Sequence, residues 1–150
     1  MPIYSQNFTG DRGTLDFLRR RIIQPGAFAE ACLKDLGAAI IASDKDPDPT
    51  SLLILGWSAT RSGDHAQALS LIGRALAKTE TDELLHARAV ILSRLGRHGE
   101  AAESFASLSE SYPESPLTPP SQFDYAIALH RSGQAGEALI VLLDLTGYLD

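Results

Sequence analysis

The sequence predicts an all-α protein built from antiparallel pairs of helices, and three observations lead to that prediction. A short phrase recurs along the 150 residues, as "RSGDHAQAL" from Arg61, "RLGRHGEAA" from Arg94 and "RSGQAGEAL" from Arg131. Apolar residues recur every three or four positions on both sides of each phrase, which is the spacing of helices with one buried face. Each phrase also contains a glycine that is followed five residues later by an alanine.

The first helix of each pair is expected to precede the glycine. Its apolar face is formed by Leu52, Leu55, Gly56 and Ala59 in the first copy, by Leu85, Ala89 and Leu92 in the second, and by Tyr125, Ala126 and Leu129 in the third. The glycine ends this helix because it accepts the left-handed conformation without steric cost. Asp48-Pro49 and Thr118-Pro119 are typical of helix starts, with an N-cap side chain followed by proline in the first turn.

The second helix of each pair is expected to follow the glycine. Its apolar positions are Ala68, Ile72, Ala75 and Leu76, then Ala101, Phe105 and Leu108, then Ala138, Leu142 and Leu145. The alanine five residues after each glycine indicates a close helix crossing, because a bulkier side chain would hold the two backbones apart. Pro113 and Pro116 are expected to end the second helix of the middle copy.

The spacing of the glycines predicts stacked repeats. Gly63, Gly96 and Gly133 follow one another at intervals of 33 and 37 residues, and Gly26 with Ala31 gives a fainter copy upstream. A near-constant period in this range indicates repeated supersecondary units, and an ordinary helical bundle is the alternative. We expect residues 1–48 to form an N-terminal arm and helix pair, with residues 14–42 as a degenerate repeat, and residues 50–150 to form three repeats. Asp35 stands where a regular repeat would have a large apolar residue.

These units resemble the tetratricopeptide repeat, whose pattern is W-x2-L-G-x2-Y, then A-x3-F, then P. The matching residues are Leu52-x2-Leu55-Gly56-x2-Ala59 with Ala68-x3-Ile72, then Arg88-Ala89-x2-Leu92 with Ala101-x3-Phe105 and Pro113, then Tyr125-Ala126-x2-Leu129 with Ala138-x3-Leu142. The resemblance covers residues 50–146. It implies a right-handed α-solenoid of antiparallel helix pairs, with about three repeats plus an N-terminal helical pair, and a concave wall lined by the first helix of each pair.

The resemblance also implies a peptide-binding groove. Its predicted residues are Leu53, Ile54, Trp57 and Arg61, then His86, Val90 and Arg94, then Phe123, Ile127 and Arg131. They form an apolar middle with one arginine per repeat, and they include none of the lysines and asparagines with which some of these domains hold a peptide carboxylate. Each arginine also has a structural alternative, since a cation at a helix C-terminus interacts favourably with the helix dipole without any ligand. Trp57 is expected either in this groove or packed against the upstream helices.

The last helix suggests a self-association edge. Helical spacing turns Ala138, Leu142 and Leu145 inward, whereas Leu139, Ile140 and Leu143 face the place of a further repeat. Because an apolar face of this size is unusual on a monomer, we expect it to be covered. A homodimer through the C-terminal helix is the first expectation, and a partner protein or the N-terminal arm are the alternatives.

Composition narrows the remaining function classes. The net charge of −6 argues against general nucleic-acid binding, and the longest apolar stretches are too short for membrane insertion. The first residues lack a secretory-signal pattern, and a single cysteine, Cys32, permits no internal disulfide or cysteine-based zinc site, which favours the cytoplasm. His65 and His98 occupy equivalent places, but without a third ligand they predict turn residues and no metal site. No catalytic motif or cofactor-binding motif is present, so we expect no enzyme and no cofactor.

We therefore expect a protein-binding module, an adaptor or chaperone, that holds an apolar or amphipathic segment. The stretch "LLILGWSATRSGDHAQALSLI" loosely resembles the small tetratricopeptide chaperones of bacterial type III secretion, and the presence of only three lysines beside many arginines and alanines favours a bacterial source. The alternative is a regulatory or scaffold fragment of a larger bacterial protein or enzyme, with self-association as its main interaction.

Overall fold

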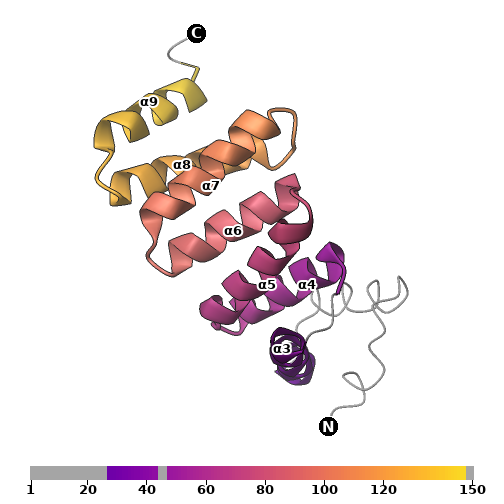
Figure 1. The fold of residues 1–150 in the computed structure, drawn as a ribbon. Helices are drawn as coiled ribbons and strands as arrows, with labels where there is room; N and C mark the ends of the chain where they lie inside the picture. The colour runs from indigo at the N-terminus through magenta and orange to yellow at the C-terminus, as the bar shows by residue number, and fades with distance from the viewer. Residues whose placement is uncertain (1–26, 44–46, 148–150) are drawn as a thin grey trace. The chain divides into compact units, whose positions relative to one another are not determined.

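A computed structural model describes residues 27–43 and 47–147, and these belong to two compact units that divide after Thr79. The described residues form seven α-helices and no strand (Figure 1). The predicted all-α class is thereby confirmed. The N-terminal arm, the first helix of the predicted N-terminal pair and Gly26 lie outside the described residues. The division into an arm of 1–48 and repeats over 50–150 stays a prediction, since the compact units are defined by packing and not by repeat period.

The first unit contains α3 (Ala27–Ala42), α4 (Pro49–Arg61) and α5 (His65–Lys78). Helix α4 begins as predicted, because the Asp48 carboxylate accepts the Ser51 backbone N–H at 2.9 Å and Pro49 occupies the first turn. It ends at Arg61, and Gly63, which follows the C-cap residue Ser62, has a left-handed φ of +86°.

Helices α4 and α5 form the antiparallel pair that the first repeated phrase predicts, and they cross closely. Ala68 is completely buried in this pair. A Cβ atom built on Gly56 would lie 2.7 Å from the Ile72 Cδ1 atom, which is closer than van der Waals contact allows. A side chain at position 56 would therefore require the Ile72 side chain to shift where α5 meets α4.

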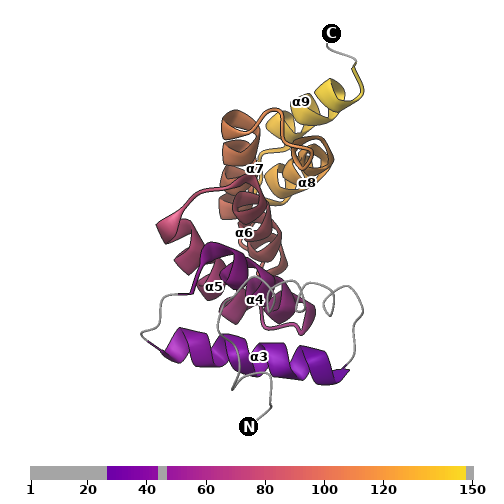
Figure 2. The same cartoon turned by 90° about the vertical axis from the view of Figure 1, so that its right-hand side faces the viewer.

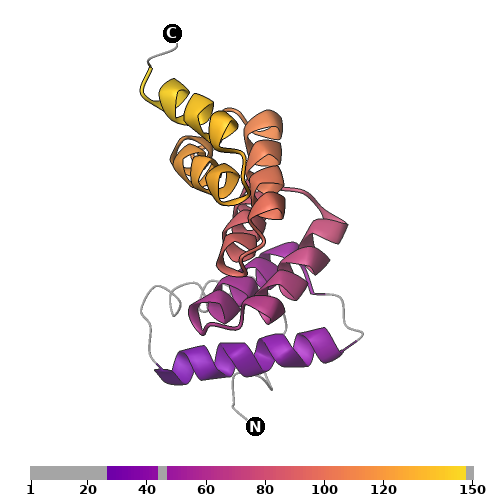
Figure 3. The same ribbon diagram turned by 90° about the vertical axis from the view of Figure 1, so that its left-hand side faces the viewer.

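Helix α3 packs on both α4 and α5 but crosses them instead of pairing with either. It is seen nearly end-on in the view that shows α4 and α5 along their length (Figure 1), and lengthwise in Figure 2 and Figure 3. Its buried residues Cys32, Leu36 and Ile40 follow helical spacing. Two side chains of α5 bind its backbone: Gln67 Nε2 donates to the Lys34 carbonyl at 3.1 Å and Arg74 Nη1 to the Ile40 carbonyl at 2.6 Å.

Helix α3 belongs to the degenerate repeat that is predicted over residues 14–42. Ala31 is exposed, unlike the alanines that follow the other glycines. The first unit thus shows one regular helix pair and one crossing helix, and a degenerate repeat over residues 14–42 stays a prediction.

The second unit contains α6 (Asp82–Arg94), α7 (His98–Ser111), α8 (Thr118–Arg131) and α9 (Ala135–Leu145). Each helix packs against the next, so the unit is two antiparallel pairs in succession (Figure 1). Gly96 and Gly133 end α6 and α8 with φ values of +79° and +91°. The predicted turn chemistry is confirmed at both positions.

The loop between α7 and α8 is held to the start of α6. The Tyr112 hydroxyl donates to the Glu80 carbonyl at 3.1 Å, and the Ser115 hydroxyl donates to the Asp82 carboxylate at 2.6 Å. The predicted N-cap at Thr118 is wrong. Helix α8 starts one residue earlier, with Leu117 as N-cap, and the Thr118 hydroxyl donates to the Tyr112 carbonyl at 2.7 Å. The Thr118 hydroxyl, which the sequence pattern assigned to the N-terminus of α8, is thus hydrogen-bonded within the loop instead.

The last helix corrects a second expectation. Leu142 lies between α8 and α9, as expected of an inward-facing residue, but it is 37% exposed and Leu145 is 43% exposed, and Ala138 is the one buried residue of α9. Their equivalents in α7, Phe105 and Leu108, are buried. The physical reason is that α8 packs on α7, whereas no described helix packs on the far side of α9.

Candidate protein-binding surface

A hollow of about 310 Å³ in the second unit brings together four of the residues predicted for the groove. Val90 and Arg94 come from α6, and Ile127 and Arg131 come from α8. The other lining residues of this α6–α8 hollow are Ser93, His98, Phe105, Asp124 and Ala128. Phe105 is fully buried and belongs to α7, which packs against both α6 and α8. The α6–α8 hollow thus combines the apolar side chains of Val90, Phe105 and Ile127 with polar and charged ones, among them the two arginines.

The two arginines occupy the same place in successive repeats. Arg94 is the last residue of α6 and Arg131 the last residue of α8, and both are exposed. A cation in the last turn of a helix interacts favourably with the helix dipole, by about 0.3–1 kcal/mol, whether or not a ligand binds. In addition, the side chains of Arg94 and Arg131 line the same α6–α8 hollow.

His86 lies outside the hollow but close to it. Burial lowers the pKa of the His86 imidazole below its ordinary value of 6.5, and the nearby Asp124 carboxylate partly offsets this by raising the pKa. Asp124 itself lines the α6–α8 hollow, so a charge there acts on the His86 imidazole. Its imidazole is half-buried.

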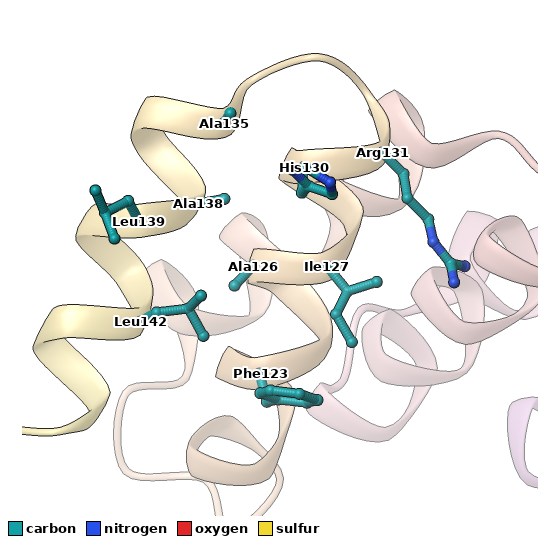
Figure 4. Close-up of a pocket in the computed structure, with 9 residues that line it drawn as sticks. All are labelled: Phe123, Ala126, Ile127, His130, Arg131, Ala135, Ala138, Leu139 and Leu142. Carbon is teal, nitrogen blue, oxygen red and sulfur yellow. The ribbon is translucent and has the colours of Figure 1, made fainter.

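A second hollow, of about 510 Å³, lies between α8 and α9 (Figure 4). Its lining residues are Phe123, Ala126, Ile127, His130, Arg131, Ala135, Ala138, Leu139 and Leu142. Figure 4 shows Leu142 directed toward α8, while Phe123 and Ile127 project from α8. Ile127 and Arg131 line both hollows, so α8 forms the ridge between them.

The four groove residues predicted from the first repeat belong to the first unit. Leu53 and Ile54 are buried, Trp57 is half-buried and Arg61 is exposed. A buried side chain presents almost no surface to a ligand, so Leu53 and Ile54 are left out of the candidate surface. The indole of Trp57 is therefore only partly accessible to a ligand.

Sequence reasoning missed Asp124 and His98 in the α6–α8 hollow. Asp124 precedes Ile127 by one helical turn, so its place beside that residue could have been predicted from the i, i+3 spacing. His98 is the first residue of α7, and its Nδ1 atom is buried without a hydrogen-bond partner. His65 is the equivalent residue of α5, and its Nδ1 is in the same situation. Among the described residues, no three metal-binding side chains come together.

The predicted self-association edge is placed on α9. Leu139 and Ile140 are exposed and Leu143 is half-buried. Together with Leu142, Leu145 and Phe123 they make the α8–α9 side of the second unit apolar. None of the described helices is long and apolar enough to cross a membrane.

Two segments of the chain, residues 49–74 and 83–106, match the family model of the tetratricopeptide repeat. They coincide with the first and second predicted repeats, and the pair α8–α9 repeats their pattern of helix, left-handed glycine and helix. These two segments of the chain are therefore tetratricopeptide repeats. Repeats of this family generally mediate protein–protein interactions and are typically not catalytic. Comparison with curated proteins and with solved structures gives no match.

Proposed function

We propose that this protein is a peptide-binding adaptor or chaperone and that the α6–α8 hollow holds an apolar or amphipathic segment of its partner. The observation that carries the proposal is the meeting of Val90 and Ile127, both half-buried, with Arg94 and Arg131 in one hollow. An apolar centre with charged groups at its border is typical of a binding surface, because burial supplies affinity and the charges fix the register.

The charges of the hollow define which segment it fits. Apolar side chains would occupy the space between Val90 and Ile127, and an acidic group would lie toward the two arginines. Asp124 also lines the hollow, and a second acidic group close to its carboxylate would be repelled. The best occupant is thus an apolar segment that is acidic at one end.

A chaperone role is the more specific form of this proposal. A chaperone shields an apolar segment of its client until the client is delivered, and the apolar side chains of Val90 and Ile127 in the hollow suit that task. The loose resemblance of residues 52–72 to type III secretion chaperones makes an export substrate a suitable client class. A cytoplasmic location belongs to the same proposal.

Site-specific photocrosslinking in the native host tests the proposed surface. A photoreactive amino acid replaces Val90 or Ile127 in turn, and a matched control carries it at Glu103, which is exposed on α7. The proposal predicts one common adduct from positions 90 and 127 that is absent from position 103. If all three positions give the same adducts, or only position 103 gives one, the α6–α8 hollow is not the binding surface.

A second candidate function is favoured by a different observation, the exposed apolar side of α9. In this alternative the chain is a regulatory or scaffold part of a larger bacterial protein or enzyme, and self-association is its main interaction. The two candidates use different residues, because Val90 and Arg94 take no part in the α9 surface.

A further inference from the structure

The residues that line the α6–α8 hollow follow a regular order along each helix. Val90 of α6 corresponds to Ile127 of α8 at an offset of 37 residues, and both line the hollow. In each helix an arginine follows the apolar residue by four positions, so Arg94 and Arg131 lie one turn further on the same face. Asp124 precedes Ile127 by three positions and therefore lies one turn before it. Along this face of α8 the order is thus acidic, apolar and basic.

The acidic and the basic residue of this face are separated by a length that a short peptide can span. Asp124 and Arg131 are two helical turns apart, which separates their Cα atoms by about 10 Å along α8. An extended peptide rises about 3.3 Å per residue, so two of its residues three positions apart span the same length. Two turns of a helical ligand would occupy about 800 Å³ or more, given a helix diameter of about 10–12 Å. A hollow of about 310 Å³ therefore favours an extended segment.

The charged side chains of the hollow have no partners within the described part of the chain. The side chains of Arg94, Arg131 and Asp124 form no hydrogen bond and no ion pair there. The exposed Arg97, in contrast, is paired with Glu100 on α7. Two guanidinium groups and one carboxylate thus line the same hollow with their charges available to a ligand.

The imidazole of His86 lies near Asp124 but does not neutralise its carboxylate at pH 7. Burial lowers the pKa of His86 below the ordinary value of 6.5, and the opposing effect of Asp124 is smaller. The imidazole is therefore mainly uncharged at pH 7. A cationic group of a ligand would find an unneutralised carboxylate at Asp124.

We infer that the α6–α8 hollow takes an extended peptide segment with an acidic and a basic residue three positions apart and apolar residues between them. The carboxylate of the segment lies at Arg94 and Arg131, and its cation lies at Asp124. Its apolar side chains contact Val90 and Ile127. The inference rests on the proposed function and deepens it, because complementary charges at both ends of the segment fix where it lies along the hollow.

Selection from a library of random octapeptides tests the inference with the whole chain immobilised. The peptides are acetylated and amidated, so that only their side chains carry charge. Peptides retained by the wild type are expected to contain an acidic and a basic residue three positions apart, with apolar residues between them. A second library with a free C-terminus distinguishes the source of the carboxylate. If the terminal carboxylate replaces the acidic side chain, the basic residue is enriched three positions before the C-terminus.

The dissociation constant is then measured for one retained amidated peptide and for a copy with glutamine in place of the basic residue. Asp124→Asn is expected to weaken binding of the first peptide by about two- to fivefold and to leave the second unchanged, because the second lacks the cation. Arg94→Gln combined with Arg131→Gln is expected to weaken both by about five- to twentyfold. Glu103→Gln and Arg88→Gln remove the same kinds of charge from exposed positions outside the hollow and are the matched controls. Circular dichroism establishes that each variant is folded.

Three results would overturn the inference: no peptide retained above a blank surface, retained peptides without the charge pair, or an effect of Asp124→Asn that is absent or equal for the two peptides. None of them removes the α6–α8 hollow as the proposed binding surface, since crosslinks from positions 90 and 127 test that proposal in the native host. The charge order and the location of the surface can therefore fail separately.

Discussion

At the scale of single residues, the titration of His86 makes the stability of the folded protein depend on pH. Burial disfavours the imidazolium form in the folded state more than Asp124 favours it, so the folded pKa lies below 6.5. The unfolded chain therefore binds this proton more readily than the folded chain. Its contribution to stability is fully present above about pH 6.5 and is lost as pH falls through the folded pKa.

This sign leads to a testable difference. As pH is lowered from about 8 to about 5, the free energy of unfolding of the wild type should fall more steeply than that of His86→Gln, whose side chain does not titrate. Urea denaturation at a series of pH values measures both slopes. Parallel slopes in the two proteins would show that His86 is not desolvated in the folded protein.

Single residues also show where sequence reasoning succeeds. The glycines at 63, 96 and 133 were assigned left-handed turns because a side chain is penalised there, and each has a positive φ. Thr118 failed as an N-cap because a hydroxyl has several nearby acceptors, and its choice of the Tyr112 carbonyl depends on how the loop folds. Conformational requirements of the backbone can be predicted locally, whereas hydrogen-bond partners of loop side chains depend on tertiary structure.

At the scale of helices, the closing glycines can be tested against a glycine inside a helix. Gly63→Ala should destabilise the protein by about 1–2 kcal/mol, because φ is +86° and no neighbouring atom lies near the added Cβ. Gly73→Ala is the control within α5. A Cβ there also meets open space, in ordinary helical backbone, so it should stabilise by about 0.5–1 kcal/mol. Opposite shifts of the melting temperature are expected, and shifts of the same sign would contradict this account of the turn.

The crossing of α6 and α7 is equally open to test. Ala101 is completely buried, so Ala101→Leu should overpack the crossing and lower stability by about 1–3 kcal/mol. Glu103→Leu, two residues further on the exposed side of the same helix, should change it by no more than about 0.5 kcal/mol. Thermal melting of both variants measures the difference. Similar small effects would mean that the alanine does not mark a close contact.

Helix by helix, the sequence predicts pairing better than it predicts exposure. The apolar spacing correctly assigned α4 to α9 as first and second helices of three pairs. It gave Leu142 and Leu145 the inward direction of their equivalents Phe105 and Leu108, although burial there depends on the next helix in the stack. The crossing of α3 over α4 and α5 could not be predicted either, because helical spacing contains no packing angle.

At the scale of the whole molecule, the predicted groove residues are divided between the two compact units. The period of the glycines and the residue pattern around them predict tetratricopeptide repeats, and the matches over residues 49–74 and 83–106 support this for two of them. Of the ten predicted groove residues, five of the second unit line its two hollows, whereas His86 lines neither and Leu53 and Ile54 are buried in the first unit. The resemblance assigns groove positions by repeat register, and whether such a position is open depends on what packs over it.

The central claim is that the α6–α8 hollow binds a partner segment, and affinity measured by calorimetry tests it most directly. The partner that crosslinks from positions 90 and 127 is titrated into wild type, Val90→Glu and Ala66→Glu, the last adding the same charge on the exposed side of α5. The account predicts that Val90→Glu weakens binding by about tenfold or more, since the carboxylate must be desolvated, while Ala66→Glu binds as wild type. Equal affinity of the three folded proteins would contradict it.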